Sequence, residues 1–232
     1  GLHRAAGPGP AVRLMPRPAT LSRERIVEAA VALAGSDGAE AVTVRALGAA
    51  LRCDPSALYR HFADVHELHR AVGDHFLGGV DVEPRPREGW RSAVRRLCLE
   101  LRRVQLRQPR LAAFVRSAPT RLGNELAFTE ALLRELRRGG FTAATSARAY
   151  HALIELTVGS AAIDAPLAAE DDPSRAAVYR QWRDDYASLT AEQHPSIAVV
   201  APHLYTGTAD DRFEEALDLL LDGLAACRRR PH

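Results

Sequence analysis

Apolar residues recur with a helical period along almost the whole chain. From Ser22 onward they are spaced three and four residues apart, as in amphipathic helices, and strand-like alternation is almost absent. After the first three helices, described below, further helices are predicted at about 64–77, 87–107, 109–117, 119–138, 142–163, 173–188 and 210–228. The less regular stretch 190–209 is predicted to be a long loop, with one short helical turn as an option. The pattern predicts an all-α protein.

Capping residues mark where the first helices begin. Ser22 precedes one apolar stripe, which Ser36-Asp37-Gly38 ends, and Thr43 precedes a short helix that reaches Leu51. Asp54-Pro55 begins a third helix, with proline at the first helical position, where its missing N–H costs nothing. Asp64 and Glu67 form a capping box for the fourth.

Breaks in the pattern divide the chain into three parts. Residues 1–21 are rich in proline, glycine and alanine and carry arginines but no acid up to residue 20, which is typical of a flexible basic arm. Met15 is the only methionine, so residues 1–14 could precede the natural start. Gly78-Gly79 and the run 81–87 interrupt the helices again. The predicted parts are therefore 1–21, 22–77 and 78–232.

Composition excludes several classes of protein. The content of 47% hydrophobic and 26% charged residues is ordinary for a globular protein, and the net charge of +2 is too small to indicate a partner. All basic residues are arginine, which is typical of a GC-rich genome and also suits phosphate and guanine. No apolar run is long enough to span a membrane or to act as a signal peptide, so we expect a cytoplasmic protein. The cysteines at 53, 98 and 227 are odd in number and widely spaced, so we expect free, mainly buried thiols.

The three short helices between residues 22 and 61 have the spacing of a helix-turn-helix. In that motif a short helix braces against the DNA backbone, and the next presents its side chains to the major groove. The segments Thr43–Leu51, Asp54–Phe62 and Asp64–Leu68 resemble the DNA-binding region of the tetracycline-repressor (TetR) family, most specifically in Leu-Tyr-Arg-His-Phe at 58–62. The segment 194–224 is similar, more weakly, to the end of the tetracycline-repressor branch.

The resemblance implies roles for individual residues. Thr43 and Arg45 would contact phosphate, Ser56, Ala57 and Arg60 would lie near base edges, and Tyr59 and His61 would hold the DNA backbone. The core of this part would contain Leu47, Leu58 and Phe62. Double-stranded operator DNA is the implied partner. The alternative for Tyr59 and His61 is that they only cover the surface.

Three residues depart from the family pattern. Arg52 stands where the family usually has a turn glycine, so its side chain must be tolerated or used on DNA. Gly48 replaces a common alanine, at a cost of about 1 kcal/mol in helix propensity. Val65 replaces a usual lysine and removes one expected phosphate contact. Affinity would then depend on Arg52 and the basic arm.

The C-terminal part is larger than DNA binding requires. The resemblance implies an effector pocket and a dimer interface, so we predict a homodimer that binds an unidentified small molecule. The predicted interface residues lie on the helices at 142–163 and 210–228: Leu153, Thr157, Val158, Ala161, Leu217, Leu220, Leu221 and Leu224. The alternative is that both faces belong to the internal core. The predicted pocket residues are Leu97, Leu101, Phe114, Leu132, Leu136, His151, Glu155 and Trp182, which could equally be core.

DNA binding has two alternatives, catalysis and a role that depends only on contacts with other proteins. Four histidines lie between residues 61 and 75, and His66 and His69 are one turn apart, but their order is not that of a zinc peptidase and no further ligand completes a set. We therefore predict no enzyme, no metal and no cofactor. A family member that has lost DNA binding and acts through protein contacts is the other alternative; Arg52 and Val65 are its only support.

Overall fold

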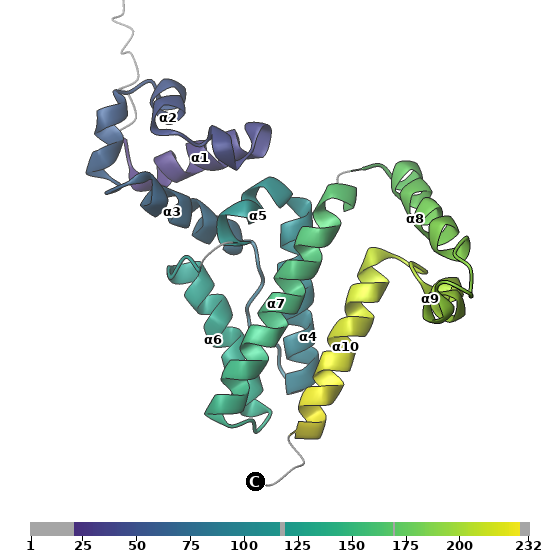
Figure 1. Cartoon of the computed structure of the whole chain (residues 1–232). Helices are drawn as coiled ribbons and strands as arrows, with labels where there is room; N and C mark the ends of the chain where they lie inside the picture. The colour runs from purple at the N-terminus through teal and green to yellow at the C-terminus, as the bar shows by residue number, and fades with distance from the viewer. Residues whose placement is uncertain (1–20, 117–118, 169, 228–232) are drawn as a thin grey trace, which may run out of the picture.

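The computed structural model describes residues 21–116, 119–168 and 170–227, and every regular element in these ranges is a helix (Figure 1). The α-helices are α1 (Arg23–Asp37), α2 (Val44–Leu51), α3 (Val65–Leu77), α4 (Trp90–Arg107), α5 (Pro109–Arg116), α6 (Gly123–Arg138), α7 (Ala143–Ala168), α8 (Asp172–Ala187), α9 (Pro195–Val200) and α10 (Ala209–Cys227). The 3-10 helices are η1 (Ala39–Ala41), η2 (Pro55–Arg60) and η3 (Ala201–His203). The all-α prediction is confirmed. The predicted basic arm lies, except for residue 21, outside the described residues.

The first helices begin at the predicted caps. The side chains of Ser22, Thr43, Asp54 and Asp64 each accept a hydrogen bond from a backbone N–H in the first turn that follows. These bonds satisfy donors that a helix N-terminus otherwise leaves free. The third helix, however, is a 3-10 helix rather than an α-helix.

Two predicted boundaries were wrong. The helix predicted over 142–163 continues as α7 through Pro166 to Ala168; a proline this near the C-terminus removes only one late hydrogen bond. The helix predicted from residue 119 begins at Gly123, because residues 119–122 form a loop. Within the predicted 190–209 loop, α9 and η3 supply more helix than expected.

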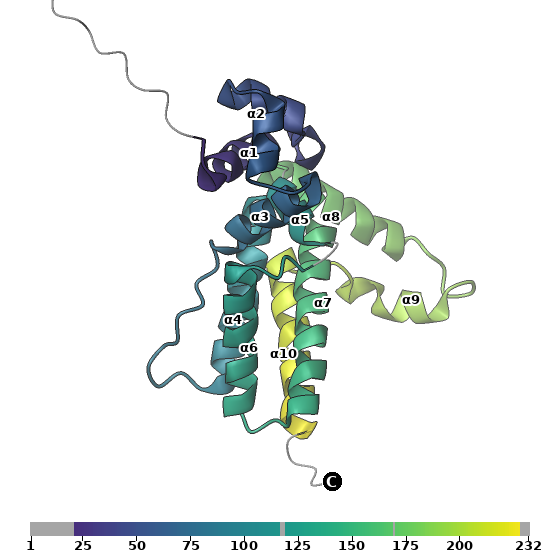
Figure 2. The same cartoon turned by 90° about the vertical axis from the view of Figure 1, so that its left-hand side faces the viewer.

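The molecule has a small head, a helical body and a projecting arm (Figures 1 and 2). Helices α1 to α3 form the head, and α4, α6, α7 and α10 run alongside one another in the body. Helix α3 packs on α5 so closely that a Cβ atom added at Gly73 would lie 2.9 Å from a methyl group of Val115. The arm, α8 and α9, extends to one side.

One buried apolar core runs from the head into the body. Cys98 is fully buried there, and burial raises the pKa of its thiol to about 12. The expectation of buried thiols holds for Cys98, whereas Cys53 is half-buried and Cys227 exposed. Arg102 is buried as well, and its guanidinium lies 2.8 Å from the carboxylate of Asp164 and 3.1 Å from that of Asp210. This charge cluster joins α4, α7 and α10.

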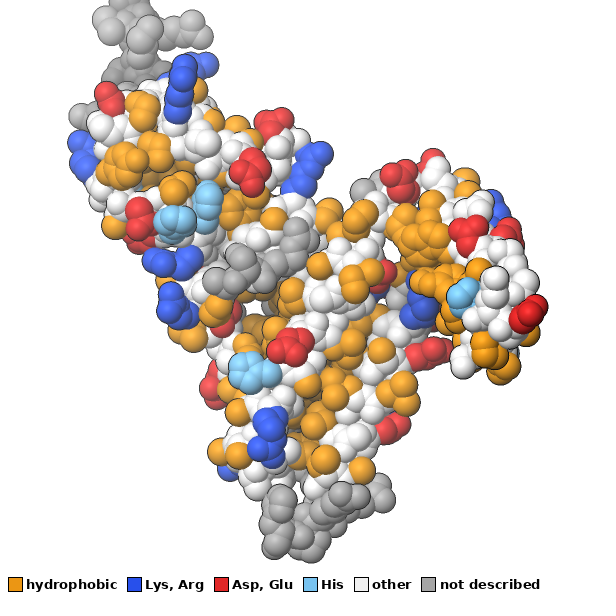
Figure 3. Space-filling model, in the orientation of Figure 1, with side chains coloured by type: hydrophobic (Ala, Val, Ile, Leu, Met, Phe, Trp, Pro, Cys, Tyr) orange, Lys and Arg blue, Asp and Glu red, His pale blue; other side chains and the backbone are white. Residues whose placement is uncertain are grey.

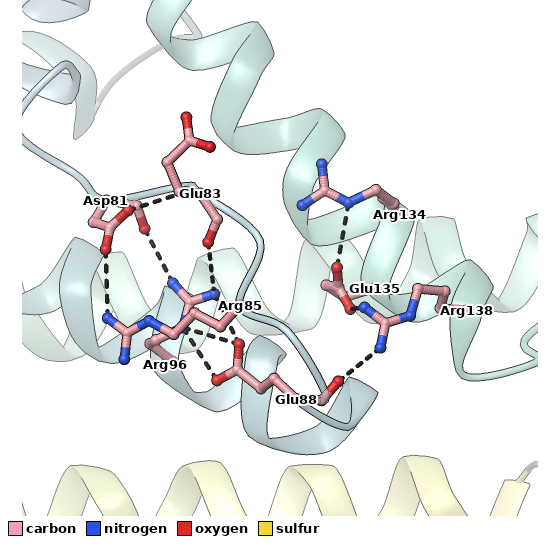
Figure 4. A network of polar contacts seen from close by, with 8 residues as sticks. All are labelled: Asp81, Glu83, Arg85, Glu88, Arg96, Arg134, Glu135 and Arg138. Carbon is pink, nitrogen blue, oxygen red and sulfur yellow. Dashed lines mark hydrogen bonds and ion pairs between the residues drawn. The ribbon is translucent and has the colours of Figure 1, made fainter.

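The segment between α3 and α4 is tied to the body by arginines (Figure 4). Arg96 of α4 binds the carboxylate of Glu88 at 3.0 Å and donates to the backbone carbonyls of Asp81 and Glu83. Arg138 of α6 donates to the Glu88 carbonyl at 2.6 Å. The segment between α3 and α4, where the predicted domain boundary falls, is therefore held in a defined position on the body.

No single helix in the described ranges is both long and apolar enough to cross a membrane. The bent pair α7 and α8, which meet at 112°, passes that test only when taken together, by length and composition.

Candidate functional site

The short helices α2 and η2 cross in the head at a glycine. A Cβ atom added at Gly48 would lie 2.9 Å from Cγ of Pro55 and 3.1 Å from the carbonyl oxygen of Cys53. Arg52 ends α2 in the left-handed conformation, with φ 53°. The chain thus turns within Arg52–Asp54 and packs η2 directly against α2.

Arg23 fixes the end of η2 against α1. Its guanidinium donates to the carbonyl oxygen of His61 at 2.7 Å, pairs with Glu67 at 2.8 Å and stacks on the ring of Phe62 at 4.1 Å. Glu67 also accepts from the backbone N–H of Ala63, and this hydrogen bond, with the nearby Arg23, lowers the pKa of the Glu67 carboxyl. The junction between η2 and α3 is therefore held by a charged side chain throughout the neutral pH range.

Most of the predicted DNA-contacting side chains are on the surface of the head. Six are exposed, whereas Ala57 and His61 are half-buried; the exposed ones are Thr43, Arg45, Arg52, Ser56, Tyr59 and Arg60. The expected core residues Leu47, Leu58 and Phe62 are buried.

The three exposed arginines of α2 and η2 have no partner among the described residues. Arg45, Arg52 and Arg60 make no ion pair or side-chain hydrogen bond there, while many arginines of the body are paired with carboxylates. Free guanidinium groups on this short exposed segment form a surface that suits phosphate and base edges.

The histidines of the head are not grouped with other metal-ligating side chains among the described residues. His69 lies 3.2 Å from the carbonyl oxygen of Val42 and packs edge-on against Phe114. Across the described ranges, no three histidine, cysteine or acidic side chains converge as they would around an ion.

A cavity of about 410 Å³ lies where α3 to α7 meet, below the head. Its apolar wall is formed by Leu77, Leu101, Val115, Pro119, Phe128, Ile154 and Val158. The polar lining residues are Gln105, Thr120, Glu125, Thr129, Tyr150 and Glu155. The size and the mainly apolar wall are those of a small-molecule site.

Only two of the eight predicted pocket residues line this cavity, Leu101 and Glu155. The other six lie elsewhere: Leu97, Leu132 and Leu136 in the packed core, Phe114 against His69, His151 on the surface, and Trp182 on α8, beside Tyr179 and Tyr205. Sequence reasoning missed Gln105, although a polar residue one turn after Leu101 in an apolar stripe was a usable signal.

Five of the eight predicted dimer residues face the interior of the chain. Leu153, Thr157, Ala161, Leu217 and Leu221 are at most 2% exposed, so the core alternative applies to them. Val158 lines the cavity, and Leu220 and Leu224 are half-buried.

The outer face of α7 and α10 carries other apolar side chains, and orange side chains gather over both helices in Figure 3. Ile163 is 77% exposed and Leu219 74%. Ile163 lines a shallow groove between the two helices, together with Leu156, Gly159, Phe213 and Ala216.

A carboxylate of the head caps a helix of the body. Asp74 of α3 accepts hydrogen bonds from the backbone N–H groups of Asn124 and Glu125, both at 3.0 Å, and from the hydroxyl of Thr120 at 3.2 Å. Leu122, at the usual capping position of α6, supplies no side-chain bond. Since Thr120 and Glu125 also line the cavity, this cap joins the cavity to the head.

Fold and surface together define a helix-turn-helix DNA-binding protein whose helical body contains a ligand-sized cavity. Comparison with known families gives the same result: residues 26–72 match the family described as bacterial regulatory proteins, tetR family, and residues 83–228 match the tetracyclin repressor-like C-terminal domain. The chain belongs to the TetR family of DNA-binding transcriptional regulators, which is not a family of enzymes.

Individual relatives match along nearly their whole length. The chain is 26% identical over 210 residues to the class C tetracycline repressor of Escherichia coli, covering 90% of this chain and 92% of the relative. It is 27% identical to an HTH-type transcriptional regulator of Saccharopolyspora erythraea, over 89% of this chain and 85% of that one. The structure of ActR of Streptomyces coelicolor in complex with actinorhodin superposes with a TM-score of 0.80 at 28% identity, covering 91% of this chain and 100% of ActR.

Proposed function

We propose that the protein is a cytoplasmic repressor that binds operator DNA as a homodimer and leaves it when a small molecule enters the α3–α7 cavity. The head, residues 22–77, would contact DNA, and residues 78–232 would bind the effector and the second copy. The proposed DNA contacts are Thr43, Arg45, Arg52, Ser56, Ala57, Tyr59, Arg60 and His61. ActR, which has a related fold, has been solved in complex with actinorhodin, and this supports small-molecule binding by the present chain.

The observation that carries the proposal is that three exposed, unpaired arginines, Arg45, Arg52 and Arg60, share the short segment α2–η2 within the matched DNA-binding region. On DNA, each guanidinium can bind a phosphate or, in a bidentate manner, the O6 and N7 atoms of guanine. The family membership and the free arginines thus point to the same surface.

Fluorescence anisotropy with DNA that flanks the protein's own gene tests the proposal. The binding constant should fall steeply with salt, because each neutralised phosphate contributes a slope of about −0.9 in a double-logarithmic plot. An intact dimer that binds no DNA even at low salt would support the protein-contact alternative instead.

Two head variants separate base reading from backbone contact. Arg60→Ala should lose affinity for the specific site by about 1–3 kcal/mol and relax base preference, whereas Tyr59→Ala should weaken specific and random DNA alike. Arg107→Ala, at an exposed arginine of α4, is the matched control and should change neither. Equal losses on both kinds of DNA for both head variants would contradict these roles.

The second copy is proposed to cover the outer face of α7 and α10. Two headpieces are needed to occupy two half-sites about one turn of DNA apart. The exposed Ile163 and Leu219 are large apolar side chains that a partner would remove from water. Both helices then contribute to an interface across a two-fold axis.

We expect the ligand to release the protein from DNA by changing the hydrogen bonds that Asp74 accepts. A ligand that moves Thr120 or Glu125 changes the hydrogen bonds that Asp74 accepts, and Asp74 lies on α3 of the head. The ligand would thereby favour a head position that does not fit two half-sites, and bound DNA would reciprocally weaken ligand binding.

A further inference from the structure

The chemistry of the cavity wall selects among possible effectors, an inference that rests on the proposed role of the α3–α7 cavity. Two carboxylates, Glu125 and the surface-exposed Glu155, are among its lining residues. No arginine or histidine is among the described lining residues, although the chain contains 31 basic residues, all arginine. The described wall is therefore apolar with a negative polar portion.

Gln105 brings an unpaired donor into this wall. Gln105 is only 2% exposed, yet its amide nitrogen Nε2 has no hydrogen-bond partner. A buried N–H group without an acceptor is energetically costly, and buried polar groups in proteins are nearly always bonded. Its place in a cavity wall means that a bound molecule can supply the missing acceptor.

Apart from the surface-exposed Glu155, the other polar side chains of the cavity already have partners. The hydroxyls of Thr129 and Tyr150 lie 3.1 Å apart, Thr120 donates to Asp74, and Glu125 accepts from the backbone N–H of Arg121 at 2.6 Å. A ligand that bonds to these groups must compete with existing hydrogen bonds. Gln105 requires no such exchange.

We propose that the effector is an uncharged or cationic, largely apolar molecule with a carbonyl-type oxygen that accepts a hydrogen bond from Nε2 of Gln105. The apolar wall accommodates its hydrocarbon or aromatic part. The carboxylates of Glu125 and Glu155 repel an anion and attract a cation. Acidic ligands are thus excluded by the same wall that admits their neutral analogues.

Four probes of similar size test the proposal by isothermal titration calorimetry on the full-length protein: benzophenone, diphenylmethane, 4-(aminomethyl)benzophenone and 4-benzoylbenzoate. Benzophenone should bind about fivefold more tightly than diphenylmethane, which lacks only the carbonyl, since a net hydrogen bond is worth about that factor. The amine should bind at least as tightly as benzophenone, and the carboxylate about tenfold more weakly.

Variants assign the preferences to residues. Gln105→Leu should abolish the preference for benzophenone over diphenylmethane, while Gln108→Leu, at the exposed C-cap of the same helix, should keep it. Glu155→Gln should reduce the advantage of the amine over the carboxylate, and Glu130→Gln, at an exposed position of α6 outside the cavity lining, should not.

The outcomes separate this inference from the proposed function. Ile154→Trp or Val158→Trp, two α7 positions that line the cavity, should fill it and abolish probe binding while DNA binding persists. Probe binding that survives both filled variants would show that the cavity is not the ligand site, and so contradict the proposed function. Binding lost in them, but tightest for the carboxylate or indifferent to the carbonyl, would overturn only the inference. Failure of all four probes to bind would overturn the inference as well, with operator binding tested separately.

Discussion

At the scale of single residues, Arg52 combines an unfavourable backbone with a free side chain. A left-handed conformation costs a non-glycine residue about 1–2 kcal/mol, and glycine adopts it without that cost. Arg52→Gly should therefore raise the free energy of unfolding by up to about 1 kcal/mol in urea titrations and, at the same time, weaken DNA binding through loss of a phosphate contact.

Arg87 provides a matched control for the predicted gain in stability and loss of DNA affinity in Arg52→Gly. It is exposed, has φ 64° and lies in the segment between α3 and α4, away from the proposed DNA contacts. Arg87→Gly should raise stability similarly and leave DNA affinity unchanged. If Arg52→Gly binds DNA as well as the parent does, Arg52 only tolerates the turn and makes no contact.

Gly48 and Pro55 form a second pair whose effect depends on both members. Gly48→Ala gains about 1 kcal/mol of helix propensity, but its methyl group would overlap the proline ring. The substitution should lower the unfolding free energy in the parent and lower it clearly less in a Pro55→Ala background, where only the contact with the Cys53 carbonyl oxygen at 3.1 Å remains, as measured by urea unfolding. Equal effects in the two backgrounds would rule out contact at this crossing.

At the scale of elements, the cap on α6 links the two parts of the chain. Asp74→Asn keeps the shape but replaces charge-assisted bonds with weaker neutral ones. We expect a loss of about 1 kcal/mol in stability and a smaller effect of effector on DNA affinity, measured by anisotropy with and without ligand. Glu130→Gln serves as the control. Full release of the variant from DNA by ligand would show that the coupling takes another path.

The helix starts that could be predicted most accurately are those set by a capping residue next to the helix in sequence. The caps at Ser22, Thr43 and Asp64 are set by hydrogen bonds within one turn, so the sequence contains all the required information. The start of α6 was missed because its capping group, Asp74, is 50 residues away in sequence. Such a partner exists only after folding.

The candidate sites differ in the same way. The head could be assigned residue by residue, because its contacts come from a short continuous segment with a specific pattern. The cavity could not, because five helices meet there, and whether Leu97 or Leu101 reaches it depends on small rotations. Helices α7 and α10 are apolar on more than one side, so the pattern alone left open which face is internal.

At the scale of the whole molecule, the outer face of α7 and α10 decides whether the protein can bind two half-sites. Leu219→Glu should convert a dimer into monomers in light scattering after size exclusion, because it places a charge in a desolvated interface. DNA with two half-sites should then bind much more weakly. Leu126→Glu, at a 55% exposed leucine of α6, is the control and should stay dimeric. A monomeric parent protein would refute the assembly outright.

The position of Asp74 has a consequence for selection in living cells. Because its hydrogen bonds lie between the head and the ligand pocket, changes there alter the response to an inducer without touching either binding surface. A screen for colonies in which the target promoter stays silent despite inducer should recover substitutions at Asp74 and Asn124, neither of which lines the cavity. Purified proteins from such colonies would bind both DNA and inducer normally, since what they have lost is communication between the two.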